Sequence, residues 1–147
     1  MQISDRMVAM TDSGKWQDLR APSLEDFETI AAVAWDNLPA RFRDACGNVV
    51  VRVEDFATDE ILKHFGMEDP FELMGLYQGV SLDRQSVSDF PRQPDMVFLY
   101  RRAILDYWAG NDETLGHLIT HVLVHEIGHH LGLSDDDMYG LEAEANS

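Results

Sequence analysis

The stretch "HVLVHEIGHHLGLSDDD", residues 121–137, combines the apolar spacing of a buried helix with a cluster of histidines and aspartates. Apolar residues recur at helical spacing through it and just before it: Leu115, Leu118, Ile119, Val122, Leu123, Ile127 and Leu131. Asn111 is expected to cap the start of this helix, and Gly132 suits the left-handed turn that ends it. The pattern therefore predicts one mostly buried helix between these two residues.

Two histidines of this helix have the spacing of metal ligands. His125 and His129 are four residues apart, so on a helix they lie on one face and can share a zinc ion. Glu126, next to the first histidine, completes an HExxH motif and is close enough to act as a general base on a water at the metal. His130 is turned about 100° from His129 and is not expected to be a ligand. The competing interpretation is a histidine-rich helix whose histidines only pack in the core or face solvent.

A third zinc ligand is expected just beyond the helix. Catalytic zinc takes three protein ligands and leaves a position for water. After Gly132 the chain can turn back toward the ion, so that Asp135 supplies a carboxylate oxygen and the motif becomes HExxHxxGxxD. Asp136 and Asp137 stay open as alternatives, because the spacing does not determine the path of the loop.

Other polar residues nearby are weaker candidates. Glu142 or Glu144 could supply the third ligand from a later helix, but residues 138–147 are expected to be too few for a helix that packs back firmly. His117 and His121 continue the series of histidines at intervals of four. Four ligands in a straight line cannot all reach one ion, so we expect these two to be packed or solvated, with His121 as a possible neighbour of the ligands.

The upstream sequence alternates short helices and strands. Ser23 and Asp26 fit the capping signal that begins a helix, and Pro39 is expected to end it. The run "NVVVRVED" has the β-branched residues of a strand, and a short helix is predicted from Thr58 to Gly66.

Two further strands and a helix follow. We expect strands in "ELMGLYQGVSL" and "DMVFLYRRA", and a short helix in "RRAILDYWAG" that ends at Gly110. A polar connection, residues 83–94, separates the two strands and could border a binding cleft. This order of helices and strands predicts an α+β domain with a small sheet.

Length and charge limit the classes of protein. A chain of 147 residues fits one domain, residues 1–147, and we expect 1–21 to be a partly ordered lead-in. The hydrophobic content of 45% is that of a globular protein. With 11 basic and 27 acidic side chains, the net charge of -16 opposes binding to nucleic acid or to an anionic membrane.

Cysteine content and the N-terminus predict a location. Cys46 is the single cysteine, so no internal disulfide is possible. The first residues have no apolar core of a secretory signal, and no later run reaches transmembrane length. These features predict a bacterial-type cytoplasm.

The sequence also resembles a known family. The stretch "HVLVHEIGHHLGLSDDD", with "VVVRVEDF", "LMGLYQGVSL" and "VFLYRRAI" before it, is similar to the small bacterial zincin-like metallopeptidases, which are minimal metalloprotease-like domains. The similarity extends from about Phe27 to Asp137. It implies a compact zincin-like fold, with the motif helix packed on a small mixed sheet whose edge strand lines the cleft. It also implies one zinc ion on His125, His129 and Asp135, with Glu126 catalytic.

These observations predict a soluble zinc-dependent peptidase that acts on a peptide or protein substrate. Glu126 would take the proton of the attacking water. Residues 96–100 are expected to form the edge strand that pairs with an extended peptide. Met138 is interpreted either as an apolar floor beneath the metal or as a packing residue. The alternatives are a zinc-binding interaction module without catalysis, whose acidic surface binds a basic partner, and a hydrolase of non-peptide amides.

Overall fold

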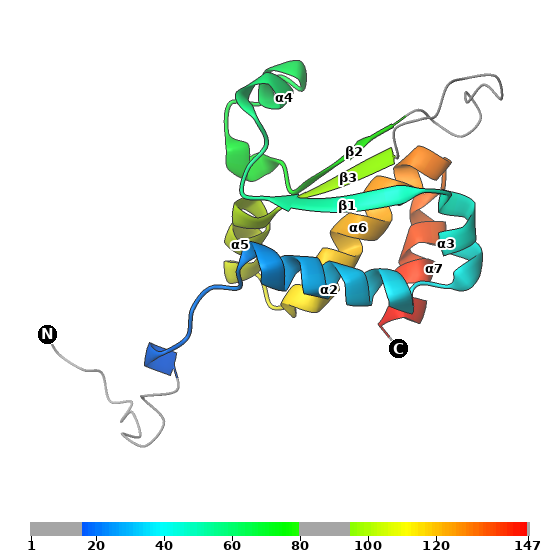
Figure 1. The fold of residues 1–147 in the computed structure, drawn as a ribbon, viewed down its shortest axis with the longest axis horizontal. Coiled ribbons are helices and arrows are strands. Elements are labelled where there is room, and N and C mark those ends of the chain that lie inside the picture. Colours follow the sequence, from blue (N-terminus) through cyan, green and yellow to red (C-terminus); the bar gives the residue numbers. More distant parts are fainter. Residues whose placement is uncertain (1–15, 80–94, 147) are drawn as a thin grey trace, which may run out of the picture.

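The structure is a computed structural model that describes residues 16–79 and 95–146. The helices in these ranges are α2 (Leu24–Asn37), α3 (Ala40–Cys46), α4 (Asp59–His64), α5 (Arg101–Ala109), α6 (Leu115–Leu131) and α7 (Asp135–Ala145), with a 3-10 turn η1 (Pro70–Glu72). The strands are β1 (Val49–Glu54), β2 (Gly75–Gln78) and β3 (Asp95–Tyr100). This arrangement confirms the predicted α+β class with a small sheet (Figure 1).

The sheet has the strand order β1-β3-β2. Strand β1 runs parallel to β3, with Val53 opposite Leu99, and β2 runs antiparallel to it, with Tyr77 opposite Val97. The prediction that residues 96–100 form the edge strand is therefore wrong. Val97 and Leu99 are fully buried, and strand β3, which contains them, gains hydrogen bonds on both sides. In the sheet formed by the described residues, β1 and the short strand β2 are the two outer strands.

Helices cover both faces of the sheet. Helices α2, α6 and α7 lie on one side and α4 on the other (Figure 1). The larger apolar core fills the space between the sheet and α2 and α6, and it includes Phe27, Val97, Leu99, Ile119 and Leu123. A smaller cluster forms on the opposite face: Ala57, Leu62, Leu76, Tyr100 and Ala103. The motif helix α6 therefore packs directly on the sheet, as the family resemblance implies.

The helix boundaries confirm some predictions and correct others. Ser23 and Asp26 form a capping box at the start of α2, as the sequence predicts. The sequence pattern does not predict helix α3, because Pro39 reads only as the end of the preceding helix. Proline is also well tolerated at a helix start, where no backbone N–H is needed, and Pro39 is the N-cap of α3.

The residue that caps the start of α6 is Thr114, whereas the sequence predicts Asn111. Thr114 caps the helix, since its side-chain oxygen accepts a hydrogen bond from the His117 backbone N–H at 3.1 Å. Asn111 does not, because its side-chain amide donates to the carbonyl oxygen of Tyr107 at the end of α5. Gly132 ends α6 in the left-handed conformation, with φ of 75°, as predicted.

Helix α7 contradicts the prediction that the last residues cannot build a packed helix. It begins within the acidic cluster, at Asp135, and Ser134 and Asp137 form its capping box. Acidic residues in its first turn also suit the positive end of the helix dipole. Met138 is fully buried and Leu141 nearly so, which anchors α7 against α6. Met138 therefore packs against α6, and its interpretation as an apolar floor beneath the metal stays a prediction.

A glycine in α6 permits this close packing. A Cβ atom added to Gly128 would lie 2.7 Å from Cγ of Met138 and would also overlap its Sδ. We expect Gly128→Ala to lower the free energy of unfolding by about 1–3 kcal/mol, because the buried methionine has to move. Gly116→Ala in the same helix is the matched control, since nothing lies within 4 Å of its added Cβ. Equal denaturant midpoints for the two variants would contradict this account of the contact between the helices.

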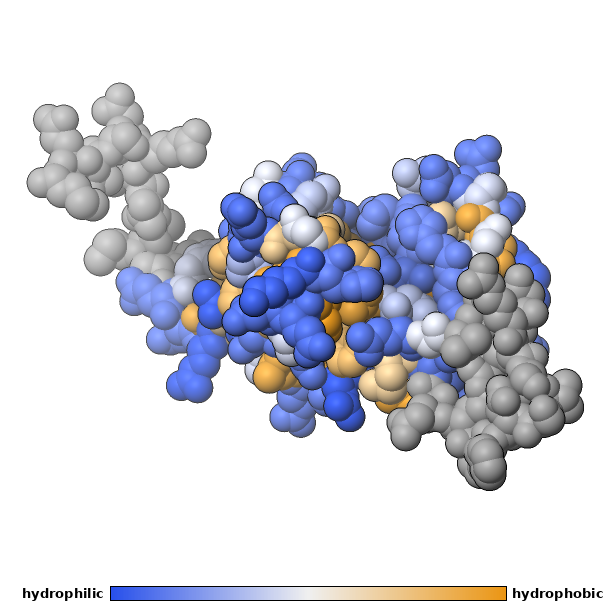
Figure 2. Space-filling model, turned by 90° about the horizontal axis from the view of Figure 1, so that it is seen from above, coloured by the Kyte–Doolittle hydropathy of each residue, from blue (hydrophilic) through white to orange (hydrophobic). Residues whose placement is uncertain are grey.

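Some predictions lie outside the described residues, among them the polar connection 83–94 and most of the lead-in. Within 16–79 and 95–146, no helix is long and apolar enough to span a membrane. Cys46 is buried in the core, and burial raises the pKa of its thiol to about 11. The face of the molecule in Figure 2 is largely hydrophilic, with apolar areas between the polar side chains.

Candidate metal centre

The predicted ligands come together at the C-terminal end of α6. His125, His129 and Asp135 each offer one ligand atom, and these atoms lie within 4.8 Å of one another. Gly132 makes this possible, because its left-handed turn reverses the chain and places the first residue of α7 beside the last turns of α6. His129 and Asp135 are exposed, whereas His125 is partly buried.

The two alternative aspartates, Asp136 and Asp137, have other surroundings. The Asp137 carboxylate accepts a hydrogen bond from the Ser134 backbone N–H at 3.3 Å, within the capping box. Asp136 is exposed, and neither residue belongs to a three-ligand group among the described residues. Of the three consecutive aspartates, the first is thus the one that faces the histidines.

The donor set fits zinc. Two imidazoles and one carboxylate are a common ligand set for catalytic zinc. Burial lowers the pKa of His125, with His121 and His129 acting in the same direction and Glu142 opposing them. His125 is therefore neutral near pH 7, which is the form of imidazole that binds a metal.

Glu126 lies between α6 and β2. The absence of a side chain at Gly75 makes room for it, since an added Cβ there would lie 3.2 Å from Cγ of Glu126 and 2.7 Å from Cγ1 of Val122. Burial raises the pKa of Glu126, while His129 and a hydrogen bond from the Tyr77 backbone lower it. The carboxylate next to the histidines is thus held against the edge strand and partly shielded from solvent.

Edge strand β2 borders a groove. Its volume is about 610 Å³, and it is lined by Thr58, Glu60, Ile61, His64, Phe65, Leu76, Tyr77, Gln78 and Gly79. These residues come from α4 and its cap on one wall and from β2 and its end on the other. The groove therefore runs beside the strand that also contacts Glu126.

Within the described residues, His130 and His117 belong to no group of candidate ligands, and their exclusion as ligands stays a prediction. The His130 ring stacks on Tyr77, with ring centroids 3.9 Å apart, and its Nε2 lies 3.7 Å from Oδ2 of Asp95. The Tyr77 hydroxyl donates to the same Asp95 oxygen at 2.9 Å. His117 pairs with Glu113 near the start of α6, at 3.0 Å. His130 thus fixes β2 to α6, and His117 lies at the surface.

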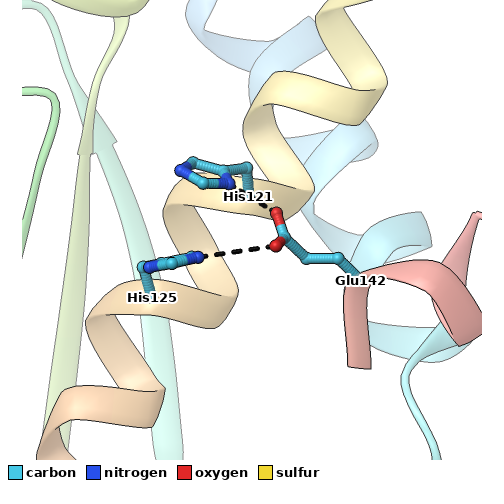
Figure 3. A group of neighbouring side chains, drawn as sticks. All are labelled: His121, His125 and Glu142. Atoms are coloured by element: carbon cyan, nitrogen blue, oxygen red, sulfur yellow. Dashed lines mark hydrogen bonds and ion pairs between the residues drawn. The ribbon is translucent and has the colours of Figure 1, made fainter. Parts of the chain in front are cut away.

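The sequence did not predict the surroundings of Glu142. The sequence predicts Glu142 only as an alternative third ligand beside His125 and His129, yet it lies next to His121 and His125 (Figure 3). The pattern that could have revealed this is the capping box at Ser134 followed by apolar residues at Met138 and Leu141, which predicts an amphipathic helix with one face toward α6.

Comparison with known proteins identifies the family. The sequence profile of the family described as "zincin-like metallopeptidase" matches residues 46–145, which include the three strands and helices α6 and α7. No match was found among curated proteins. Because the matched region covers well over half of the chain, the chain belongs to the zincin-like metallopeptidase family, which indicates a zinc-dependent hydrolase that acts on peptides.

Proposed function

We propose that the protein is a zinc peptidase in which His125, His129 and Asp135 hold one zinc ion and Glu126 is the general base. The observation that carries this proposal is the grouping of the three ligand atoms within 4.8 Å, on the helix that also holds Glu126. Membership of the zincin-like metallopeptidase family supports the metal and the reaction class.

The residues have complementary tasks. Bound by these ligands, zinc would lower the pKa of a coordinated water toward about 7 and polarise the scissile carbonyl. Glu126 takes a proton from the attacking water as the new C–O bond forms. It then delivers this proton to the amide nitrogen as the C–N bond breaks, because an amide anion is a very poor leaving group. Partial burial strengthens Glu126 as a base by raising its pKa.

An extended peptide suits the space beside β2. In this proposal an extended peptide lies along β2, which is an outer strand of the sheet formed by the described residues. Gly75 brings β2 close to Glu126, and a peptide on this edge would pass the proposed base. Its alternate side chains would point toward the groove next to α4. Backbone pairing of this kind tolerates many sequences.

The test is digestion of a peptide library with and without the metal. We expect the zinc-loaded protein to cleave peptides, and removal of zinc by a chelator to lower the rate at least about 100-fold. Addition of zinc should restore the rate, whereas magnesium should not, because it prefers oxygen ligands. A panel of small amides assayed in parallel separates the peptidase from an amide hydrolase. A zinc-loaded protein that cleaves neither class would be a binding module instead.

A further inference from the structure

A second group of ligating side chains lies one helical turn before the first. It consists of His121 and His125 on α6 and Glu142 on α7, whose ligand atoms lie within 4.8 Å of one another. Oε1 of Glu142 is 2.5 Å from Nδ1 of His121, and Oε2 is 3.4 Å from Nε2 of His125. Both imidazoles thus face one carboxylate across the contact between the two helices (Figure 3).

Burial makes this group unusual. Glu142 is only 6% exposed, and a carboxylate removed from water is costly unless a charge or several hydrogen bonds compensate it. Within residues 16–79 and 95–146, Glu142 has no lysine or arginine partner, and its only ion-pair partners are His121 and His125, which carry a positive charge only when they are protonated. Nε2 of His125 is also buried and makes no hydrogen bond, since 3.4 Å is long for one.

A divalent metal ion would resolve both features. It would neutralise the Glu142 carboxylate and take the lone pair of the His125 nitrogen. Two imidazole nitrogens and one carboxylate oxygen suit zinc and its neighbours in the first transition row better than magnesium or calcium, which prefer oxygen ligands. The chemistry of the donors therefore defines the class of ligand.

We propose that His121, His125 and Glu142 form a second metal position, which holds zinc or a similar transition metal. His125 belongs to this second position and also to the first position, which consists of His125, His129 and Asp135. The inference therefore rests on the proposed function, which assigns His129 and Asp135 to the first position. A neutral imidazole has one lone pair for a metal, and His125 therefore serves one ion at a time. When a metal ion occupies the second position, His125 is not available to the first position. The chain then binds its metal ion without the complete set of His125, His129 and Asp135 that the proposed catalysis needs.

The test removes the first position and keeps the second. In the double variant His129→Asn, Asp135→Asn both changed side chains are exposed, so the fold should persist. We expect this variant to bind about one cobalt or zinc ion per chain, measured by elemental analysis and by the visible absorption of cobalt, and to hydrolyse no peptide. Adding Glu142→Gln should weaken metal binding more than about 10-fold. Adding Glu144→Gln is the matched control, since Glu144 is exposed on the same helix and pairs with Arg41.

Two results would overturn the second position. One is a folded double variant, by circular dichroism, that binds no cobalt or zinc. The other is equal metal affinity after Glu142→Gln and after Glu144→Gln. If the double variant does not fold, His129→Gln alone serves for the same comparison. Neither result affects the proposed function, which is tested by hydrolysis in the wild-type protein, and a wild-type protein without hydrolysis would leave these metal titrations valid.

Discussion

Replacing Glu126 with glutamine is expected to lower the rate of peptide hydrolysis at least about 100-fold while the chain keeps its zinc. Glutamine has nearly the same volume, so it can occupy the space between α6 and β2 that Gly75 leaves open. It cannot take a proton from the attacking water, and the three metal ligands are unchanged. Initial rates and zinc content should be measured on the same preparation.

Glu28→Gln is a suitable control for Glu126→Gln, since Glu28 is exposed on α2 and belongs to neither ligand group. It removes one negative charge without touching the centre, and its rate should equal that of the wild type. A Glu126→Gln variant that hydrolyses peptides at the wild-type rate would show that Glu126 is not the base. Loss of zinc in this variant would indicate a structural role instead.

Replacing His125 with alanine is expected to abolish specific zinc binding, because His125 belongs to both ligand groups. Replacing Asp135 with alanine removes only the first group. It should abolish hydrolysis, while zinc remains bound through His121, His125 and Glu142. The measurement is zinc per chain by elemental analysis after dialysis, together with the rate of peptide cleavage.

Asp136→Ala is the matched control for Asp135→Ala, because Asp136 is the adjacent residue, carries the same charge and is also exposed. We expect it to keep both zinc and activity. A His125→Ala variant that binds zinc as the wild type does would contradict both groups. Loss of hydrolysis in Asp136→Ala but not in Asp135→Ala would mean that the third ligand is assigned to the wrong aspartate.

The sequence predicts those helices and strands that are determined by residues close together in the chain. Helix α6 followed from apolar residues at helical spacing and from Gly132, and α2 followed from the capping residues Ser23 and Asp26. The start of α6 was misplaced because Asn111 and Thr114 are both good caps. The choice between them depends on the hydrogen bond from Asn111 to Tyr107, which belongs to the preceding helix.

Features that depend on distant segments were not predictable in this way. The central place of β3 results from its pairing with both β1 and β2, and the apolar pattern of a strand does not specify its neighbours. The three aspartates favour the interpretation as candidate ligands and so hide the start of helix α7, although Ser134 and Asp137 also form a capping box. The segment 134–137 thus contains both the start of α7 and the proposed ligand Asp135.

The residues of the candidate site also fall into a group that local spacing predicts and a group that depends on distant contacts. His125, Glu126 and His129 follow from spacing within one helix, and the turn at Gly132 suggested Asp135. Their roles stay predictions. The pairing of Glu142 with His121 and His125 depends on how α7 packs on α6, and Met138 and Gly128 control that contact. No pattern of histidine spacing contains this information.

The most direct test of the central claim is a titration of metal-free protein with zinc, in which bound zinc and peptide cleavage are measured in the same samples. The account predicts no cleavage without zinc, a rate that rises in proportion to zinc bound, and saturation near one ion per chain, with Glu126→Gln binding zinc equally but staying inactive. Cleavage by the metal-free chain, or a rate that does not change as zinc binds, would contradict it.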